Sequence, residues 1–582
     1  MNDRGLSLSL PEMLKGYVLA NIRYENDQRE VNVLWKEHMQ TLRALSEEED
    51  VDFFKNWLRA RYAETIRPGQ KGAENKDYER IGSEFHRWVR DRREHLGLTD
   101  SDAFKRFVTR DLHFYARQTR KIREAARKLT PGLEAIRYNE ERGFTLQTQL
   151  LLASLEPTDT KEIVNAKLKL VASFLDIWLA RRVWCFRTIA YSSVKYTLFT
   201  LTRELRGRTL QEAATFLQRT LDEQPERFAL EPHFRLHQQN YHQVRHILAR
   251  LTHWLDEQCG LASHFEDLIS QGRARPFEIE HIWPDHYERF ASECSSPGEF
   301  ETQRNMLGGL LLLQRGVNQS LSDSPYEAKR DAYAAHSQNL LARSLHPMAY
   351  LNNPAFTAFT TRTGLPFRSF EHFGLEAQLE RQVLYIRMAE WVWNSSRLNL
   401  DGERPPAHDP IKVEATQAPK PPPGQEPLRY GERREFWREL LAHARQRTTL
   451  FSRVNPSRDS WLGTGAGKTG LSYNFVVKQE ETRAELYINT LNRELNKAHF
   501  DKLFEQRAGI DAAFGEKLVW QRLNEKNPCR IGHVLSLGGW TNRSCWPEVI
   551  AATVDAMLRL HAVLHPYVQR LESEGHGGST TL

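Results

Sequence analysis

Three residues have the types and the order that phosphodiester hydrolysis requires. Glu280 and His281 are adjacent in the run Glu-His-Ile-Trp-Pro, and Asn318 follows further along the chain. Such hydrolysis needs a base that deprotonates water and a cation that stabilises the charge developing on the phosphate and on the leaving oxygen. Imidazole is suited to act as the base near neutral pH, and carboxylate and amide oxygens suit a hard cation such as Mg²⁺ or Mn²⁺. We therefore expect His281 to be the base and Glu280 and Asn318 to be metal ligands.

Two strands followed by a helix would bring these residues together. Pro284 and the pair Pro297-Gly298 interrupt the chain after the first strand, residues 306–313 can form the second strand, and a helix can begin near Asn318. This order resembles the HNH (ββα-metal) nuclease site, in which the base ends the first strand. Taken singly, His281 could be a structural histidine and Asn318 a helix cap. The ordered set favours the catalytic interpretation.

Longer stretches around these residues resemble a known family. The runs EHIWP, RNMLGGLLLLQRGVNQS and SPYEAKRDAY are similar to the C-terminal nuclease domain of GmrSD-type, modification-dependent restriction endonucleases. The opening run MNDRGLSLSLPEMLKGYVL resembles the end of the ParB-like, nucleotide-dependent half of the same proteins. The resemblance implies a cytoplasmic, metal-dependent endonuclease of an anti-phage restriction system, with DNA, including modified phage DNA, as its substrate.

Two departures from the family pattern bear on activity. Members carry Asn in the second strand where this sequence has Gly309, and that Asn holds the loop of the base in place; Asn305 could take over this catalytic role. The family's glutamine-arginine nucleotide signature belongs upstream of Asn2-Asp3-Arg4-Gly5 and does not occur in this chain. We therefore expect no nucleotide dependence within this chain. Either an internal methionine was taken as the start, or the nucleotide-binding ParB-like half is a separate subunit.

Basic residues at two places are candidates for contact with phosphates. Lys329 and Arg330 would lie beyond Asn318 on the helical side of the site. Residues 104–129 read as a helix rich in Lys and Arg, including Arg117, Arg120 and Lys121, which could follow a phosphate backbone. The alternative is a solvated helix face that pairs with acidic neighbours, because the net charge of +6 is diluted over the whole chain.

The chain is long enough for several domains, and we expect a multidomain, mainly α protein. Apolar residues at helical spacing fill the region before the Glu-His run, in segments such as 51–62, 81–93 and 163–196. The predicted domains are a helical region at 1–235, an HNH nuclease domain embedded in helices at 236–400, a Pro-rich linker at 401–429 and a small α+β domain at 430–582.

The last domain resembles a small domain of unknown function at the C-termini of restriction and defence proteins, which implies targeting or partner binding. Its pattern predicts helices at 434–446 and up to about residue 514, a strand pair at 471–477 and 486–488, a strand at 518–523 and a long helix at 547–571. The run Gly463 to Thr469 looks like a phosphate-binding loop, but Leu462 stands where that motif needs Gly, so we expect a turn into a hairpin. Trp520, Trp540 and Trp546 could stack on a base, but core packing is favoured.

The remaining composition narrows the class of protein. The five cysteines are scattered without a paired motif, which favours a reducing compartment over a disulfide framework or a zinc site. The apolar segment 171–191 is interrupted by Asp176, Arg181, Arg182 and Arg187, so no membrane segment is expected. Against the nuclease hypothesis stands a non-catalytic DNA-binding or assembly subunit whose HNH site is degenerate because of Gly309. An RNA-directed toxin is a weaker third, since HNH folds also degrade RNA.

Overall fold

The structure is a computed structural model that divides into two compact units, Met1–Pro419 and Lys420–Leu582. It describes residues 8–66, 76–237, 239–262, 265–270, 272, 275–335, 338–402, 404–406, 411, 428–452, 454–456, 460–468, 470–478, 480–490, 492–523, 527–541 and 543–571. The opening run Asn2-Asp3-Arg4-Gly5 and nearly all of the predicted Pro-rich linker lie outside these residues.

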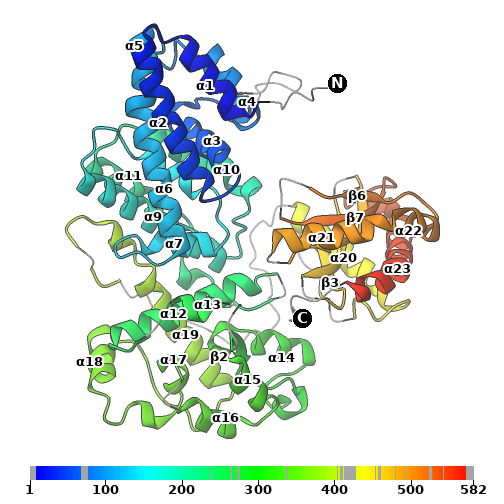
Figure 1. The fold of residues 1–582 in the computed structure, drawn as a ribbon. Helices are drawn as coiled ribbons and strands as arrows, with labels where there is room; N and C mark the ends of the chain where they lie inside the picture. The colour runs from blue at the N-terminus through cyan, green and yellow to red at the C-terminus, as the bar shows by residue number, and fades with distance from the viewer. Residues whose placement is uncertain are drawn as a thin grey trace, which may run out of the picture. The chain divides into compact units, whose positions relative to one another are not determined.

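The first unit is built almost wholly of helices (Figure 1). Its first part comprises α1 (Leu10–Ala20), α2 (Glu25–Arg43), α3 (Glu49–Tyr62), α4 (Asp77–Asp91), α5 (Ser101–Arg106), the π-helical η1 (Phe107–Leu112), α6 (His113–Arg127), α7 (Glu134–Glu141), α8 (Gln147–Ala153), α9 (Lys161–Trp184), α10 (Tyr191–Leu205), α11 (Leu210–Asp222), the 3-10 turn η2 (Phe228–Leu230) and α12 (Tyr241–Gln258).

The second part of this unit holds a hairpin among shorter helices. Its elements are α13 (Phe265–Ile269), β1 (Phe277–His281), η3 (Tyr287–Phe290), α14 (Pro297–Arg304), η4 (Leu307–Gly309), β2 (Leu310–Gln314), α15 (Arg315–Leu321), α16 (Tyr326–Tyr333), α17 (Leu340–Arg343), η5 (Pro347–Ala349), α18 (Pro354–Thr363), α19 (Leu375–Val392) and η6 (Ser395–Leu398). One continuous hydrophobic core runs from Leu14 to Leu398, so the predicted division near residue 235 passes through shared packing.

The predicted helices are present, with two differences in continuity. The segments predicted at 51–62 and 81–93 are α3 and α4. The stretch 104–129 is interrupted by the π-helical η1, and the stretch 163–196 is divided into α9 and α10 by a loop in which Phe186 has φ of +52°. Local apolar spacing continues through both interruptions, which is why the sequence alone did not reveal them.

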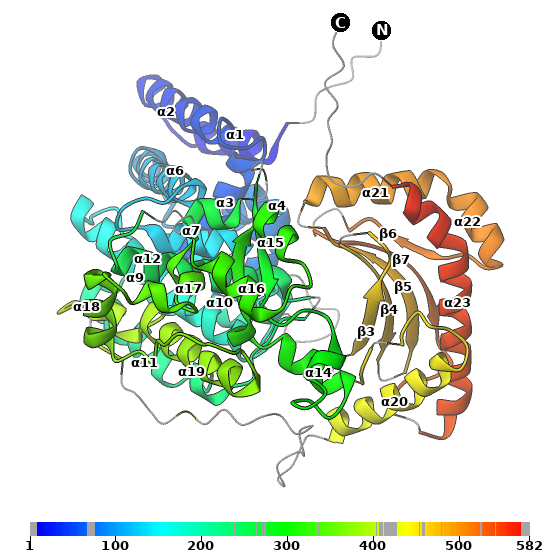
Figure 2. The same cartoon turned by 90° about the horizontal axis from the view of Figure 1, so that it is seen from below.

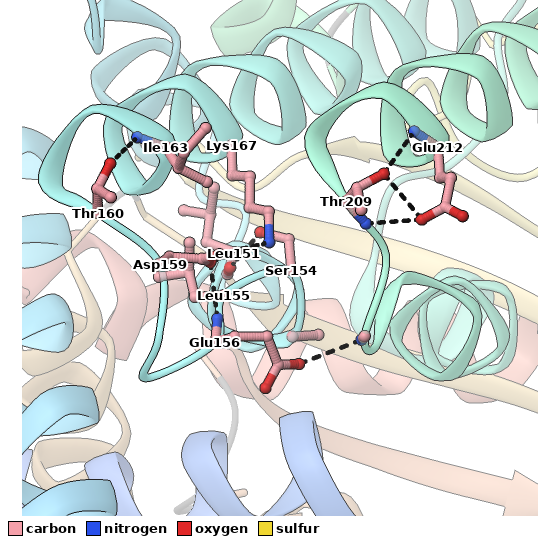
Figure 3. Close-up of polar contacts among 12 residues, drawn as sticks. Leu151, Ser154, Leu155, Glu156, Asp159, Thr160, Ile163, Lys167, Thr209 and Glu212 are labelled. Carbon is pink, nitrogen blue, oxygen red and sulfur yellow. Dashed lines mark hydrogen bonds and ion pairs between the residues drawn. The ribbon is translucent and has the colours of Figure 1, made fainter.

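Side-chain caps and one buried ion pair fix the helices on either side of α10. The Thr160 hydroxyl caps α9 by accepting from the backbone of its first turn, and Thr209 forms a capping box with Glu212 at α11 (Figure 3). Lys167, within α9, donates its ammonium to the carboxylate of Asp159, which lies just before the helix, at 2.9 Å. Lys167 is only 2% exposed. Each such cap typically stabilises a helix by about 1 kcal/mol, so these contacts define where the helices begin.

A ββα unit lies within the second part, in the predicted order. β1 pairs antiparallel with β2, with Glu280 opposite Leu311 and His281 opposite Leu310, and α15 follows β2 directly. Within β2, the run Leu310 to Leu313 is buried on both of its faces, and α12 and α17 pack against the strand. The continuous apolar run thus indicates a strand covered on both sides.

The second unit is a five-stranded antiparallel sheet with helices. Its strand order is β3 (Trp461–Gly465), β4 (Leu471–Val477), β5 (Thr482–Ile488), β7 (Cys529–Leu535) and β6 (Val519–Gln521). The helices are α20 (Leu428–Arg445), α21 (Arg493–Glu505), α22 (Arg507–Phe514), the 3-10 turn η7 (Arg543–Cys545) and α23 (Trp546–Arg570), and Figure 2 shows α20 and α23 along one face of the sheet. The mainly α, multidomain fold class with a small α+β C-terminal domain is therefore confirmed.

Most element predictions for this unit hold. The Gly-rich run does connect two antiparallel strands, β3 and β4, with Gly467 and Gly470 at positive φ, so the hairpin interpretation is confirmed. Trp540 and Trp546 are buried in the core, as expected, and Trp520 is partly buried against Phe500 and Phe504. The sequence did not predict β3 or β7. Among the described residues, no helix is both long and apolar enough to cross a membrane.

Candidate functional site

The end of β1 is held by a lysine from another helix. Phe277 and Ile279 alternate with Glu278 and Glu280 along the strand, which is the pattern of a strand with two different faces. The ammonium of Lys329, on α16, donates to the backbone carbonyl of His281 at 2.8 Å. This contact fixes the backbone that carries both Glu280 and His281.

His281 and Asn305 form a direct pair whose orientation follows from the hydrogen bonds. The Asn305 Nδ2 group donates to the Glu301 carbonyl at 2.8 Å, which turns its Oδ1 toward His281 Nε2 at 3.0 Å. Because Oδ1 can only accept, Nε2 must carry the proton of the neutral ring. The other ring nitrogen, Nδ1, then holds a lone pair that can accept a proton.

The surroundings of His281 favour its neutral form. Burial, together with the positive charges of Arg304 and Lys329, lowers the pKa of His281 to about 4. The bond to Asn305 and the charge of Asp285 act in the opposite direction but do not outweigh these causes. The half-buried imidazole is therefore unprotonated at neutral pH, as a base must be.

Glu280 is a buried carboxylate with two partners on one helix. Its Oε1 accepts from Lys329 at 2.7 Å and from the Tyr333 hydroxyl at 2.8 Å, and Glu280 is 5% exposed. Lys329 and Tyr333 are four positions apart on α16 and therefore share a helix face. Both hydrogen bonds end on the same carboxylate oxygen of Glu280, Oε1.

The structure places Asn318 beside a different carboxylate from the one predicted. Asn318 lies on α15, half-buried, with its Nδ2 at 3.5 Å from Oε2 of Glu278, whose other oxygen accepts from Arg315 at 2.7 Å. Glu278 and Glu280 are on the same face of β1 because strand residues alternate. The structure thus gives no direct contact between Glu280 and Asn318, and it adds Glu278 to the site.

The donor set suits a hard cation in type. Glu278, Glu280 and Asn318 supply carboxylate and amide oxygens, which are the ligands that Mg²⁺ and Mn²⁺ prefer. Among the described residues, no three His, Cys, Asp or Glu side chains are placed to hold a metal together, but the predicted set needs only carboxylates and one amide. The ammonium of Lys329 already balances part of the charge of Glu280.

A side chain of another helix fills the space beside Gly309. A Cβ on Gly309 would lie 2.7 Å from the side-chain Nε2 of Gln378, on α19, and the same Gln378 amide bonds to the backbone of Gln303. Next to it, a Cβ on Gly308 would lie 2.4 Å from the backbone nitrogen of Gln382. The missing Asn is therefore matched by a Gln side chain that fills its place beside the loop of the base.

We expect Gly308→Ala to destabilise the first unit more than Gly309→Ala does. At Gly308 the added methyl meets backbone atoms of α19, which cannot move away, whereas at Gly309 it meets a flexible side chain. Overpacking of this kind costs about 1–3 kcal/mol. Thermal unfolding of the two variants measures the difference, and equal melting temperatures would contradict the close packing of η4 on α19.

The predicted phosphate contacts have different fates. The prediction for Lys329 is corrected, since its ammonium is buried against Glu280 and the side chain is 1% exposed. Arg330 is half-buried with its Nη2 at 3.5 Å from Asp331. Arg117 and Arg120 are exposed on α6, Arg120 pairs with Glu124 at 2.9 Å, and Lys121 is half-buried with its ammonium on Asn165.

Four residues of the basic stretch are paired with acidic neighbours. Lys105, Arg110, Arg120 and Arg123 all make ion pairs with Asp or Glu side chains. This agrees with the solvated-face alternative for these four residues.

Sequence reasoning missed two side chains of the site, Glu278 and Tyr333. The Glu-x-Glu spacing on a strand could have identified Glu278, because residues two apart share a face. The spacing of four between Lys329 and Tyr333 placed them on one helix face but gave no sign of what that face covers.

Comparisons with known proteins fall on two regions of the chain. Residues 222–385 match the family model described as GmrSD restriction endonucleases, C-terminal domain. Residues 432–568 match a domain of unknown function, DUF4268. Neither the curated proteins nor the solved structures contain a match to the chain.

Proposed function

Because residues 222–385 make this chain a member of the GmrSD-type restriction endonuclease family, we propose that it is a metal-dependent DNA endonuclease of the HNH type. The observation that carries the proposal is His281 at the end of β1, with its ring orientation set by Asn305 and a carboxylate next to it. All residues used in the proposed chemistry lie on the ββα unit, at the end of α14 or on α16.

His281 would act as the general base. Its Nε2 donates to Asn305, so Nδ1 is the atom that takes a proton from the attacking water. Asn305 is a positioning residue in this scheme, because it fixes the ring without touching the reacting atoms. Its amide is itself held by the Glu301 carbonyl.

Glu280 and Asn318, with Glu278 beside Asn318, would hold a Mg²⁺ or Mn²⁺ ion through oxygen atoms. Such an ion would stabilise the negative charge that develops on the phosphate and on the leaving oxygen. Lys329 and Tyr333 keep Glu280 in a fixed position by binding its Oε1. Lys329 also balances part of the charge of this buried carboxylate.

The substrate we propose is foreign DNA, in particular phage DNA that carries modified bases, in a bacterial cytoplasm. The family assignment supports restriction as the biological role. A separate ParB-like, nucleotide-binding subunit is the partner that this assignment suggests. Arg117, Arg120 and Arg330 remain candidates for phosphate contact.

The experiment compares Asn318→Ala with Gln319→Ala in a DNA-nicking assay with Mg²⁺. Asn318 makes only a long contact of 3.5 Å, so its removal leaves the fold intact. We expect Asn318→Ala to cut at least about tenfold more slowly and to need more Mg²⁺, since it loses a metal ligand. Gln319→Ala, an exposed neighbour on α15, should match the wild type. Equal activity of the two variants across a Mg²⁺ titration would remove Asn318 from the metal site.

The second candidate is a non-catalytic DNA-binding or assembly subunit, which the Gly309 position favours. Its test is protection of bacteria against phage after Glu280, His281 and Asn318 are replaced together. Unchanged protection would favour the non-catalytic role, and loss of protection with retained folding would favour the nuclease.

A further inference from the structure

The sheet of the second unit has one face in the hydrophobic core and a second face that carries mainly polar and aromatic residues. The described helices of this unit contribute their buried side chains to a core that includes Tyr473, Phe475, Ala484, Leu486 and Ile531 from the sheet. Strand residues alternate between faces, so the neighbours of these residues point the other way. The second face carries Trp461, Val476, Arg483, Val534, Ser472, Asn474, Glu485, Tyr487, Arg530 and Gln521.

The centre of this second face is a row of four residues on neighbouring strands. Asn474 of β4 lies between Gly463 and Glu485, and Glu485 of β5 lies between Asn474 and Gly532. A Cβ on Gly463 would lie 2.3 Å from Oδ1 of Asn474, and a Cβ on Gly532 would lie 2.8 Å from Cβ of Glu485. The two glycines therefore give the amide and the carboxylate room to lie flat across the sheet.

This row holds buried polar atoms without a hydrogen-bond partner. Asn474 and Glu485 are each 4% exposed, yet Asn474 Oδ1 and Glu485 Oε2 accept no hydrogen bond within the described structure. Arg483 Nε lies 2.8 Å from Glu485 Oε2 and forms an ion pair with it. Arg530 Nε is likewise buried without a hydrogen bond. An unsatisfied buried polar atom costs about 1–3 kcal/mol, so Asn474 Oδ1 and Arg530 Nε on this face indicate a surface shaped for a polar ligand.

Aromatic rings flank the polar row on both sides. On β3, Trp461 lies two residues before Gly463 and shares a cross-strand row with Arg483. On β5, Tyr487 lies two residues after Glu485 and pairs across the strands with Arg530. Both rings are half-buried and lie outside the hydrophobic core of the unit. Aromatic rings beside arginines on a sheet face are the arrangement by which sheets bind bases and phosphates of single-stranded nucleic acid.

From these contacts we propose that this sheet face binds a guanine base of single-stranded nucleic acid, read by Asn474 and Glu485. Asn474 Oδ1 and Glu485 Oε2 are both acceptors, and Glu485 Oε2 also forms ion pairs with Arg483 at 2.8 Å and Arg530 at 3.9 Å. Guanine is the base whose pairing edge offers neighbouring N–H donors, and a carboxylate strengthens such bonds. Trp461 and Tyr487 stack on bases, and Arg483 and Arg530 bind phosphate or the base oxygen.

This site is separate from the ββα unit, and its occupancy does not require cleavage. The test measures binding of labelled single-stranded oligonucleotides of about 12 nucleotides to the full-length protein by fluorescence anisotropy, with a chelator present. The probes alternate thymine with guanine, with hypoxanthine or with further thymine, in DNA and RNA forms. Hypoxanthine lacks only the amino group of guanine, so this pair isolates one hydrogen bond.

We expect the guanine probe to bind at least about tenfold more tightly than the hypoxanthine and thymine probes. Glu485→Gln should abolish this preference, and Trp461→Ala, at the sheet edge, should weaken all probes. Arg559→Ala is the control. Arg559 lies on α23, where it pairs with Glu516, and its removal should leave the binding of all probes unchanged. If Glu485→Gln fails to fold, the comparison of the guanine and hypoxanthine probes and the Trp461→Ala variant still test whether the sheet face binds guanine.

Equal binding of the three probes by the wild type would overturn the proposal, as would a guanine preference that survives Glu485→Gln. Displacement of the probe by guanosine monophosphate at a similar concentration would show a free-nucleotide site and would also overturn it. Asn318→Ala, which affects only the proposed metal site, should keep the guanine preference. Failure of the nuclease and failure of this site can therefore be told apart.

Discussion

Replacement of His281 by alanine should slow DNA cleavage by about 100-fold to 10,000-fold, the range that loss of a general base produces. The imidazole is neutral at neutral pH because burial lowers its pKa to about 4, and its Nε2 is already committed to Asn305. Alanine leaves the water without an acceptor for its proton. The measurement is the initial rate of nicking of supercoiled phage or plasmid DNA with Mg²⁺.

His286→Ala is the matched control for this variant. His286 follows on the same segment, is 42% exposed in its side chain, and lies 3.3 Å from Asp323. Its removal should leave the rate within about twofold of the wild type, as expected for an exposed pair. Nicking that persists unchanged in His281→Ala, in a protein with an unaltered melting temperature, would remove His281 from the chemistry.

The sequence predicts the ββα unit well because the signals for it are local. Alternating Phe277, Ile279 and Glu280, the break at Pro284 and the apolar run of β2 each fix one element within a few residues. Asn305 was predicted to take over the role of the missing Asn because it lies four residues before Gly309, and the structure places it in contact with His281. Roles in catalysis stay predictions until the variants are measured.

Contacts made by distant segments could not be read in the same way. Lys329 was predicted to reach phosphates because it would lie further along the helix that begins near Asn318. It lies instead on a separate helix, α16, where its ammonium is buried against Glu280. Gln378 fills the place beside Gly309 only because α19 packs on η4. Neither arrangement leaves a periodic signal in the sequence, since each depends on which helix face meets the hairpin.

The strand β7 was missed for a related reason. Its alternation of Ile531 and Leu535 with Arg530, Gly532 and Val534 is a weak strand signal, because glycine and arginine are not strand formers. The structure explains both residues by the polar row on the second face of the sheet, where Gly532 makes room for Glu485. This local departure from strand propensity thus falls on the sheet face that we propose binds a base.

Asp176→Ala should destabilise the first unit by about 3–5 kcal/mol, the cost of breaking a buried ion pair by removing one partner. Asp176 on α9 is fully buried and accepts from Arg250 at 2.9 and 3.0 Å, from the Trp393 ring nitrogen at 3.0 Å and from Arg397 at 3.4 Å. Arg142 is also buried, 4.0 Å away. Without Asp176, the buried guanidinium groups of Arg142 and Arg250 and the half-buried one of Arg397 lose this carboxylate as their balancing charge.

Hydrogen–deuterium exchange is the suitable measurement, because it reports on each unit separately. Exchange should rise in α9 and α12 and stay unchanged in β4 and β5, which belong to the separate core of the second unit. Glu124→Ala serves as the control, since it removes an exposed pair with Arg120 and should cost less than about 0.5 kcal/mol. Unchanged exchange in α9 would show that the arginines are compensated by other groups.

The same substitution makes a prediction about pH whose sign follows from the charges. Burial raises the pKa of Asp176, but Arg250, Arg397 and Arg142 outweigh this and hold the pKa below its ordinary value. A carboxyl group with a lowered pKa stabilises the fold at any pH above its unfolded value of about 4, and this contribution is lost as the pH falls below it. The difference in stability between the wild type and Asp176→Ala should therefore be constant near neutral pH and shrink in acid. A difference that instead grows in acid would mean that Asp176 is protonated in the folded protein and that the arginines are balanced elsewhere.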